Sequence, residues 1–221
     1  MRFRPEIQLL EERLNRKFSN PYEVVELFEQ EMAQFCGAPF GVACDSSTHA
    51  IELCLIRNQQ LPQFTVPKRT YLSVPMTLKK LGKPFKWSDE AWKGQYHLGN
   101  GKIFDCSLRL KKDMYIPKTT MCLSFQFRKR LPIGRGGMIL LDSAEDYRWY
   151  KKAVHDGRTP GTLWKQDPVD MLGYHYYMTP DDAARGLLLY YDLPENLPDL
   201  GGHLDYPDLT TLPVFKNDEA E

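Results

Sequence analysis

The chain has 221 residues, of which 42% are hydrophobic and 26% are charged, as is ordinary for a soluble globular protein. Its 29 basic and 29 acidic side chains cancel, which argues against binding to nucleic acid or to an anionic membrane through overall charge. No apolar run is long enough to span a bilayer, and the charged start of the chain lacks the apolar core of a signal peptide, so we expect a cytoplasmic protein.

Helical and extended patterns alternate along the chain. Residues 20–37 are expected to form a helix, because Asn20 and Pro21 are typical of a helix start, Gly37 is typical of a helix end, and apolar residues recur between them at helical spacing. Similar signals predict helices over residues 46–60, 74–82, 143–157 and 179–193, and strands over residues 39–45, 63–67, 83–89, 101–107, 119–127 and 136–142. This alternation predicts an α/β sheet with helices on its faces.

Two further features bound the organisation. The five cysteines have neither CxxC nor zinc-site spacing and mostly lie among apolar residues, so we expect reduced core thiols. Residues 194–221 are rich in proline and aspartate and poorly periodic, which predicts an irregular tail after a domain over residues 1–193.

Polar side chains follow several of the predicted strands, where ligands bind in α/β sheets. Ser46, Ser47 and Thr48 lie between a strand and a helix start. Free backbone N–H groups and hydroxyls at such a helix start suit a phosphate, although the same residue types are common as simple helix caps. Tyr71 follows the strand that ends at Pro67, and its ring could stack on a flat ligand or pack half-buried.

Two charged side chains hold similar positions. Asp105 ends an apolar strand, so its carboxylate needs a partner such as a cation, a metal or a protonated ring nitrogen, unless it only caps a turn. Lys129 follows an apolar run and lies between Arg128 and Arg130, ahead of a glycine-rich turn. Partial burial beside two cations would lower the pKa of Lys129 and favour the free amine that attacks a carbonyl, whereas three adjacent cations can equally mark a solvated loop.

In this order, the segments resemble the DegT/DnrJ/StrS family of sugar aminotransferases, fold type I enzymes that use pyridoxal phosphate (PLP). Five collinear segments over about residues 20–190 carry the resemblance: "VVELFEQEMAQFCGAPFGVACDSSTHAIELCL", "VPKRTYLSVPMTLKKLGKPFKWSD", "IFDCS", "LSFQFRKRLPIGRGGMIL" and "LGYHYYMTPDDAARGLLL". The resemblance implies a three-layer α/β/α fold with a mostly parallel central sheet, as a trimmed version of the PLP-dependent transferase large domain.

The resemblance also implies roles for individual residues. Lys129 would bind PLP covalently, and Asp105 would pair with the pyridine nitrogen and keep it protonated, so that the ring acts as an electron sink. The other implied cofactor-binding residues are Ser47, Thr48 and Ser124 at the phosphate, Tyr71 on the ring face, and His175 or Tyr177 near the phosphate held by the partner subunit of a homodimer. No metal is implied.

Several positions depart from the family pattern. Ser47 replaces a glycine, Leu108 a glutamine that contacts the cofactor, Arg135 a glutamate, and His175 and Tyr177 an asparagine and an arginine. Between residues 89 and 103 there is room for neither the usual helix nor the usual strand. After residue 193 too little chain remains for the family's small domain, so we expect a site open to solvent on that side.

The implied activity is a PLP-dependent transfer of an amino group from an amino acid, expected to be glutamate, to a nucleotide-linked keto sugar, as in polysaccharide biosynthesis. Lys129 and Asp105 favour this aminotransferase. Leu108 and the missing substrate domain favour an alternative, a reduced family member that keeps the fold and the PLP but has little activity and acts as a binding or regulatory module. Nucleic-acid binding through residues 127–130 is disfavoured by the zero net charge.

Overall fold

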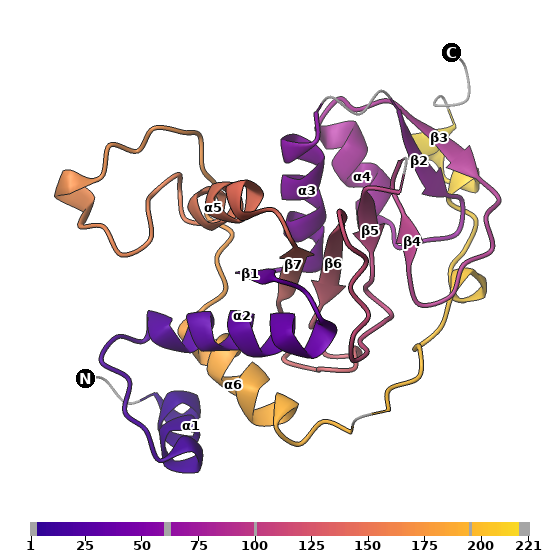
Figure 1. Ribbon diagram of the computed structural model, residues 1–221. Coiled ribbons are helices and arrows are strands. Elements are labelled where there is room, and N and C mark those ends of the chain that lie inside the picture. The colour runs from indigo at the N-terminus through magenta and orange to yellow at the C-terminus, as the bar shows by residue number, and fades with distance from the viewer. Residues whose placement is uncertain (1–3, 60–62, 100, 195, 217–221) are drawn as a thin grey trace.

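The computed structural model describes residues 4–59, 63–99, 101–194 and 196–216 (Figure 1). Its α-helices are α1 (Pro5–Leu14), α2 (Tyr22–Cys36), α3 (Ser47–Arg57), α4 (Ser73–Lys80), α5 (Ala144–Ala153) and α6 (Pro180–Tyr190). Its strands are β1 (Phe40–Cys44), β2 (Phe64–Pro67), β3 (Phe85–Ser88), β4 (Tyr96–His97), β5 (Ile103–Asp105), β6 (Thr120–Ser124) and β7 (Gly137–Leu141). The predicted end of a helix at residue 60 and the predicted tail over 217–221 lie outside the described residues.

Capping residues set most helix starts. Ser46, Ser143 and Thr179 each accept a hydrogen bond from the backbone N–H three residues later, as their place before α3, α5 and α6 predicted. At α2 the N-cap is Pro21 instead of the expected Asn20, because the chain is already helical at Pro21, where φ is −54° and ψ is −30°. The side-chain oxygen of Asn20 still accepts from the first helical N–H.

Two helices differ from the sequence pattern. The helix predicted over residues 143–157 ends at Ala153, and Gly157 instead forms a left-handed turn with φ +79°. Helix α1 was not predicted, although Pro5 starts it and its apolar residues Ile7 and Leu10 are buried against α6. No described helix has the length and apolar character that a membrane crossing requires.

The main sheet has the strand order β1-β7-β6-β5-β4, and β2 pairs with β3 in a separate parallel sheet. Strand β7 is antiparallel to both β1 and β6, β5 is parallel to β6, and β4 is antiparallel to β5. The expected mostly parallel sheet is therefore mixed among the described strands: β1, β5 and β6 share a direction that β7 and β4 oppose. Residues 125–136 return from β6 to β7 as a loop without a crossover helix, which makes these neighbours antiparallel.

Helices cover both faces of the sheet, which confirms the three-layer α/β/α class (Figure 1). Met138 and Leu140 of β7 belong to the core shared with α1, α2 and α6, whereas Ile139 and Leu141 belong to the core shared with α3, α4 and α5. This alternation follows from the two-residue period of a strand. The five cysteines are free and buried, as expected.

The segment between residues 89 and 103 contains a strand that the sequence pattern did not predict. Its described residues form no helix, but they do form a strand, because Tyr96 and His97 pair with Asp105 and Phe104 across β5. A two-residue strand gives too little periodicity to be predicted, and only the edge of β5 defines it.

The segment after residue 193 follows the surface of the domain. Among its described residues the helices are short 3-10 turns, at His203–Asp205, Leu209–Thr211 and Pro213–Phe215. It is nevertheless anchored, because Leu197, Leu209 and Phe215 are buried and because the backbone N–H of Leu200 donates to the carbonyl of Leu108. This segment therefore passes beside the carboxyl end of β5.

Candidate functional site

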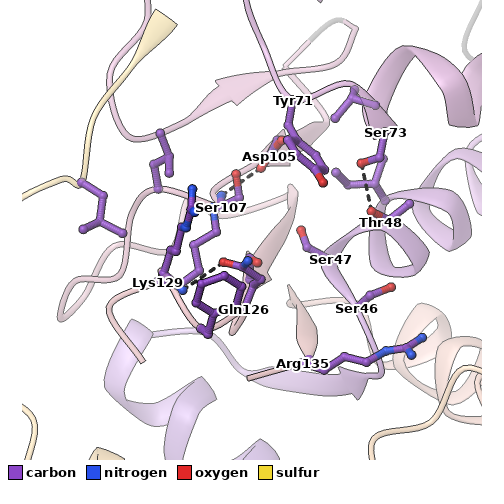
Figure 2. A pocket seen from close by; sticks show the side chains of 18 of the residues that line it. Ser46, Ser47, Thr48, Tyr71, Ser73, Asp105, Ser107, Gln126, Lys129 and Arg135 are labelled. Atoms are coloured by element: carbon purple, nitrogen blue, oxygen red, sulfur yellow. Dashed lines mark hydrogen bonds between the residues drawn. The ribbon is translucent and has the colours of Figure 1, made fainter. Parts of the chain in front are cut away.

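A cavity of about 700 Å³ lies beside the start of α3, the carboxyl ends of β5 and β6, and the loop 125–136 (Figure 2). This volume is in the range of small-molecule sites. Six of the eight predicted site residues line it: Ser47, Thr48, Tyr71, Asp105, Ser124 and Lys129. The structure thus brings these six residues together, while their individual roles stay predictions.

The strand directions explain why these residues meet. Asp105 ends β5, Ser124 ends β6, and Ser47 follows β1, and these three strands run in one direction. Their carboxyl ends therefore lie at one edge of the sheet, where α/β proteins bind ligands. Gly137 lets antiparallel β7 lie directly beside the start of α3, since a Cβ there would come within 2.5 Å of the Ser46 carbonyl carbon and the Ser47 nitrogen.

The start of α3 has the features of an anion site. Ser46 caps the helix, and Thr48 Oγ1 donates to Ser73 Oγ at 2.9 Å. Ser47 Oγ is buried and has no hydrogen-bond partner among the described residues. A buried hydroxyl is rarely left unpaired, and the N-terminus of a helix attracts negative charge. These two observations fit the phosphate of PLP.

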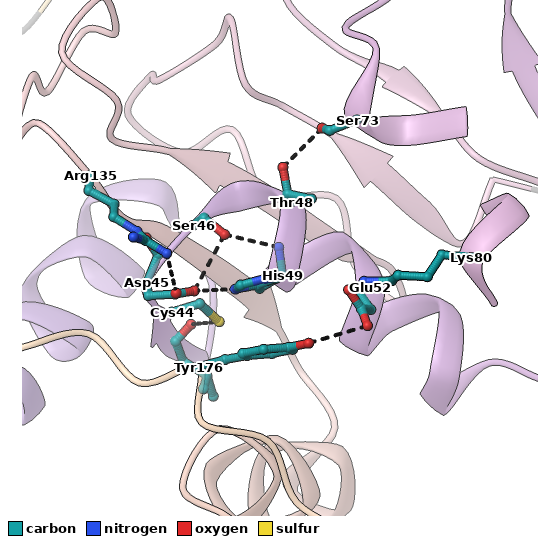
Figure 3. A network of polar contacts seen from close by, with 11 residues as sticks. Cys44, Asp45, Ser46, Thr48, His49, Glu52, Ser73, Lys80, Arg135 and Tyr176 are labelled. Atoms are coloured by element: carbon teal, nitrogen blue, oxygen red, sulfur yellow. Dashed lines mark hydrogen bonds and ion pairs between the residues drawn. The ribbon is translucent and has the colours of Figure 1, made fainter. Parts of the chain in front are cut away.

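A polar network holds the other side of the same helix start (Figure 3). Asp45 accepts from Arg135 at 2.7 Å and lies 2.6 Å from His49 Nδ1. The His49 ring stacks on Tyr176, with the ring centres 3.7 Å apart. Arg135, which stands where the family has glutamate, therefore has its charge balanced by Asp45 at the rim of the cavity.

Asp105 is buried, with 3% of its surface exposed. Its Oδ1 accepts from the backbone N–H of Ser107 at 2.8 Å, and its Oδ2 accepts from the hydroxyl of Tyr96 at 2.8 Å. The turn-capping alternative is therefore part of its role. Within the described residues no cation lies at ion-pair distance, so this buried carboxylate fits a cationic ring nitrogen in the cavity.

Lys129 extends into the cavity from the loop after β6 (Figure 2). Burial, which disfavours the ammonium form, lowers its pKa, and the negative charge of Asp105 opposes that effect in part. The neighbouring arginines, which were expected to lower the pKa of Lys129 further, do not contribute to this shift. Arg128 lies over the Phe127 ring at the same cavity, and Arg130 donates to the carbonyl of Pro198.

Tyr71 lines the cavity and is exposed, with 59% of its surface accessible, so its ring is free to contact a ligand. His175 and Tyr177 do not line the cavity. His175 contacts Asp156 at 3.0 Å, and the ring of Tyr177 stacks on His155. Their implied role concerns a partner subunit and stays a prediction.

Several lining residues were missed at the level of sequence. Leu200, Asp205 and Tyr206 come from the irregular segment after residue 193. Burial and the charge of Asp105 raise the pKa of Tyr206 to about 12. A segment without periodicity gives no signal of what it covers, so these residues could not have been found. Leu108 also lines the cavity, as expected for a residue that stands where the family has a cofactor-contacting glutamine.

Solved structures of aminotransferases share this fold. AtS13 from Actinomadura melliaura matches with a TM-score of 0.64 and 18% identity over 77% of this chain and 60% of its own. PseC from Helicobacter pylori, an aminotransferase involved in pseudoaminic acid biosynthesis, matches with 0.63 and 14% over 87% and 64%. Spr1654 from Streptococcus pneumoniae, described as a sugar aminotransferase and solved in a PMP form, matches with the same values. The chain thus spans less than two thirds of these proteins.

Part of the family resemblance is also found at the level of sequence. Residues 4–83 match the model of the DegT/DnrJ/EryC1/StrS aminotransferase family. This range includes the helix start with Ser47 and Thr48, and Tyr71. No curated protein matches the chain.

Proposed function

We propose that this protein is a PLP-dependent aminotransferase that moves an amino group from glutamate to a nucleotide-linked keto sugar. The observation that carries the proposal is one cavity that combines Lys129, buried Asp105 and the unpartnered hydroxyl of Ser47. The match to the family over residues 4–83 and the fold shared with sugar aminotransferases support it.

Different side chains bind different parts of the cofactor. Ser47, Thr48 and Ser124, together with the N–H groups that open α3, bind the phosphate. Tyr71 covers one face of the ring, and Asp105 accepts a hydrogen bond from the ring nitrogen. Bound PLP supplies an electron sink for the bond that breaks at the amino acid Cα.

Lys129 has two tasks. Its Nζ would hold the cofactor in the resting enzyme, and, once an amino acid has displaced it, its free amine would be the base that moves a proton at the substrate Cα. Because burial lowers the pKa of Lys129, the neutral amine that both tasks need is more populated than it is for an exposed lysine.

Two parts of the proposal rest on the family alone. The glutamate donor and the nucleotide-linked sugar follow from the resemblance and from relatives such as PseC, whose title names a role in pseudoaminic acid biosynthesis. The homodimer follows from the resemblance of the tyrosine-rich segment 173–178 to the family segment that reaches the partner subunit's cofactor phosphate.

A second candidate function keeps the cofactor but has little turnover and acts as a binding or regulatory module. The specific observation in its favour is Leu108, which lines the cavity where the family has a glutamine that contacts the cofactor. Colour and turnover separate the two candidates: both bind PLP and absorb visible light, but only the aminotransferase loses that absorption when glutamate is added.

The direct experiment is borohydride reduction of the purified protein with PLP, followed by peptide mass mapping. We expect the pyridoxyl group on Lys129 and no labelling of a Lys129→Ala variant. Lys111→Ala is the matched control, because Lys111 pairs with Asp199 outside the cavity and should leave labelling intact. A label on Lys111 or Lys118, or on no lysine, would overturn the proposal.

A further inference from the structure

Strand β4 places a tyrosine against the buried carboxylate of the site. Tyr96 is the register partner of Asp105 in the antiparallel pair of β4 and β5. Side chains directly opposite each other in such a pair lie on the same face of the sheet, which is why the Tyr96 hydroxyl reaches Asp105 Oδ2 at 2.8 Å. Tyr96 itself is 3% exposed and does not line the cavity.

A second hydroxyl fixes the direction of this hydrogen bond. Thr70 Oγ1 lies 2.6 Å from the Tyr96 hydroxyl oxygen, and Thr70 is 1% exposed. An ionised carboxylate can only accept, so Tyr96 must use its one proton toward Asp105. Thr70 must then donate to Tyr96. The result is a buried relay in which Thr70 donates to Tyr96 and Tyr96 donates to Asp105.

The relay is stable over the working range of pH. Burial, together with the negative charge of Asp105, raises the pKa of Tyr96 well above its ordinary value. The phenol therefore keeps its proton and stays a donor. The Trp92 ring packs against Tyr96 with ring centres 4.8 Å apart, which limits rotation of the phenol away from Asp105.

The two carboxylate oxygens are held separately. Ser107 N–H fixes Oδ1 and Tyr96 fixes Oδ2, so the plane of the carboxylate is set from two sides. Each oxygen keeps a further lone pair for a donor in the cavity.

We propose that Tyr96 and Thr70 are positioning residues that hold the Asp105 carboxylate oriented toward the cavity, so that a proton shared with the ring nitrogen of the cofactor stays on that nitrogen. This rests on the proposed cofactor. Without the relay, a proton between Asp105 and the ring nitrogen moves toward the carboxylate, and the ring loses its strength as an electron sink.

The test uses the full-length protein loaded with PLP that carries ¹⁵N in its ring. The ¹⁵N chemical shift reports whether the ring nitrogen is protonated, and cofactor affinity is measured alongside by absorbance titration. In Tyr96→Phe we expect the shift to move toward the unprotonated value and PLP binding to weaken about tenfold, as expected when a charged group loses a hydrogen bond. Thr70→Val should show the same change at smaller size, and Thr70→Ser should restore most of the original shift.

Tyr150→Phe is the matched control. Tyr150 is also fully buried, but its hydroxyl has no hydrogen-bond partner among the described residues, and it does not line the cavity. Its removal should leave the ¹⁵N shift and the affinity unchanged. Thermal unfolding of each variant separates a folding defect from a change at the ring, and Thr70→Val carries the test if Tyr96→Phe does not fold.

The outcomes distinguish this inference from the proposed function. If the wild-type protein binds no PLP, both are wrong. If it binds PLP with a protonated ring nitrogen and neither Tyr96→Phe nor Thr70→Val changes the shift, the positioning role is wrong while the proposed function stands. An equal change in Tyr150→Phe would also overturn it, because the effect would then come from loss of any buried hydroxyl.

Discussion

Replacing Asp105 with asparagine tests the centre of the proposed site, because it removes the charge while keeping the shape. Asparagine can still accept from the Ser107 N–H through its carbonyl oxygen. Its NH₂ group then faces Tyr96, whose hydroxyl must turn its proton toward Thr70, which is 2.6 Å away. The hydrogen-bond network can therefore adapt around the new side chain.

The expected loss of activity follows because the substitution removes the charge of Asp105 without disturbing the fold. Asp105 is buried without a cation at ion-pair distance among the described residues, so neutralising it should not lower the melting temperature of the protein without cofactor. The ring nitrogen, however, loses the charge that keeps it protonated. We expect transamination to fall at least about a hundredfold, which corresponds to about 2.7 kcal/mol on the barrier.

The assay is the half-reaction with glutamate, followed through the loss of the visible absorption of bound PLP in single-turnover experiments. Retained PLP binding with slow loss of absorption is the expected result. An asparagine variant as fast as the wild type would mean that Asp105 is only a turn cap. A variant that unfolds would mean that the carboxylate has a structural role that its neighbours do not reveal.

Three further predictions concern other parts of the molecule. Because burial lowers the pKa of Lys129, the charge of this side chain opposes folding below that pKa. Lys129→Met should therefore raise the melting temperature of the protein without cofactor. The gain should shrink as the pH rises from the lowered pKa toward the pKa of a lysine in the unfolded chain. Lys151→Met should cost about 3–5 kcal/mol of unfolding free energy in urea titrations, since it leaves buried Glu29 without its 2.6 Å partner, and adding Glu29→Gln should recover part of the loss. If the protein is a homodimer with shared sites, dilution should release PLP as light scattering falls to the monomer value; a monomer that keeps PLP would exclude shared sites.

Local signals in the sequence were enough for most elements and for the main candidates. Helix caps such as Ser143 and Thr179 act within one turn of helix, so they can be predicted without a structure. Lys129 and Asp105 were identified because each follows an apolar strand, and a strand end is a local pattern. The family resemblance then joined candidates that lie far apart along the chain.

Only the tertiary structure decided how these pieces meet. The direction of β7, the pairing of Tyr96 with Asp105 and the wall that Tyr206 adds to the cavity all depend on contacts between distant segments. The cause of the lowered pKa of Lys129 is a further example, because it is burial and not the adjacent arginines that the sequence suggested. The sequence by itself determined which groups are available at strand ends and helix starts, because capping and periodicity depend only on residues a few positions apart. Which neutral donors hold the buried carboxylate was set by strand register, a long-range property that no local pattern records.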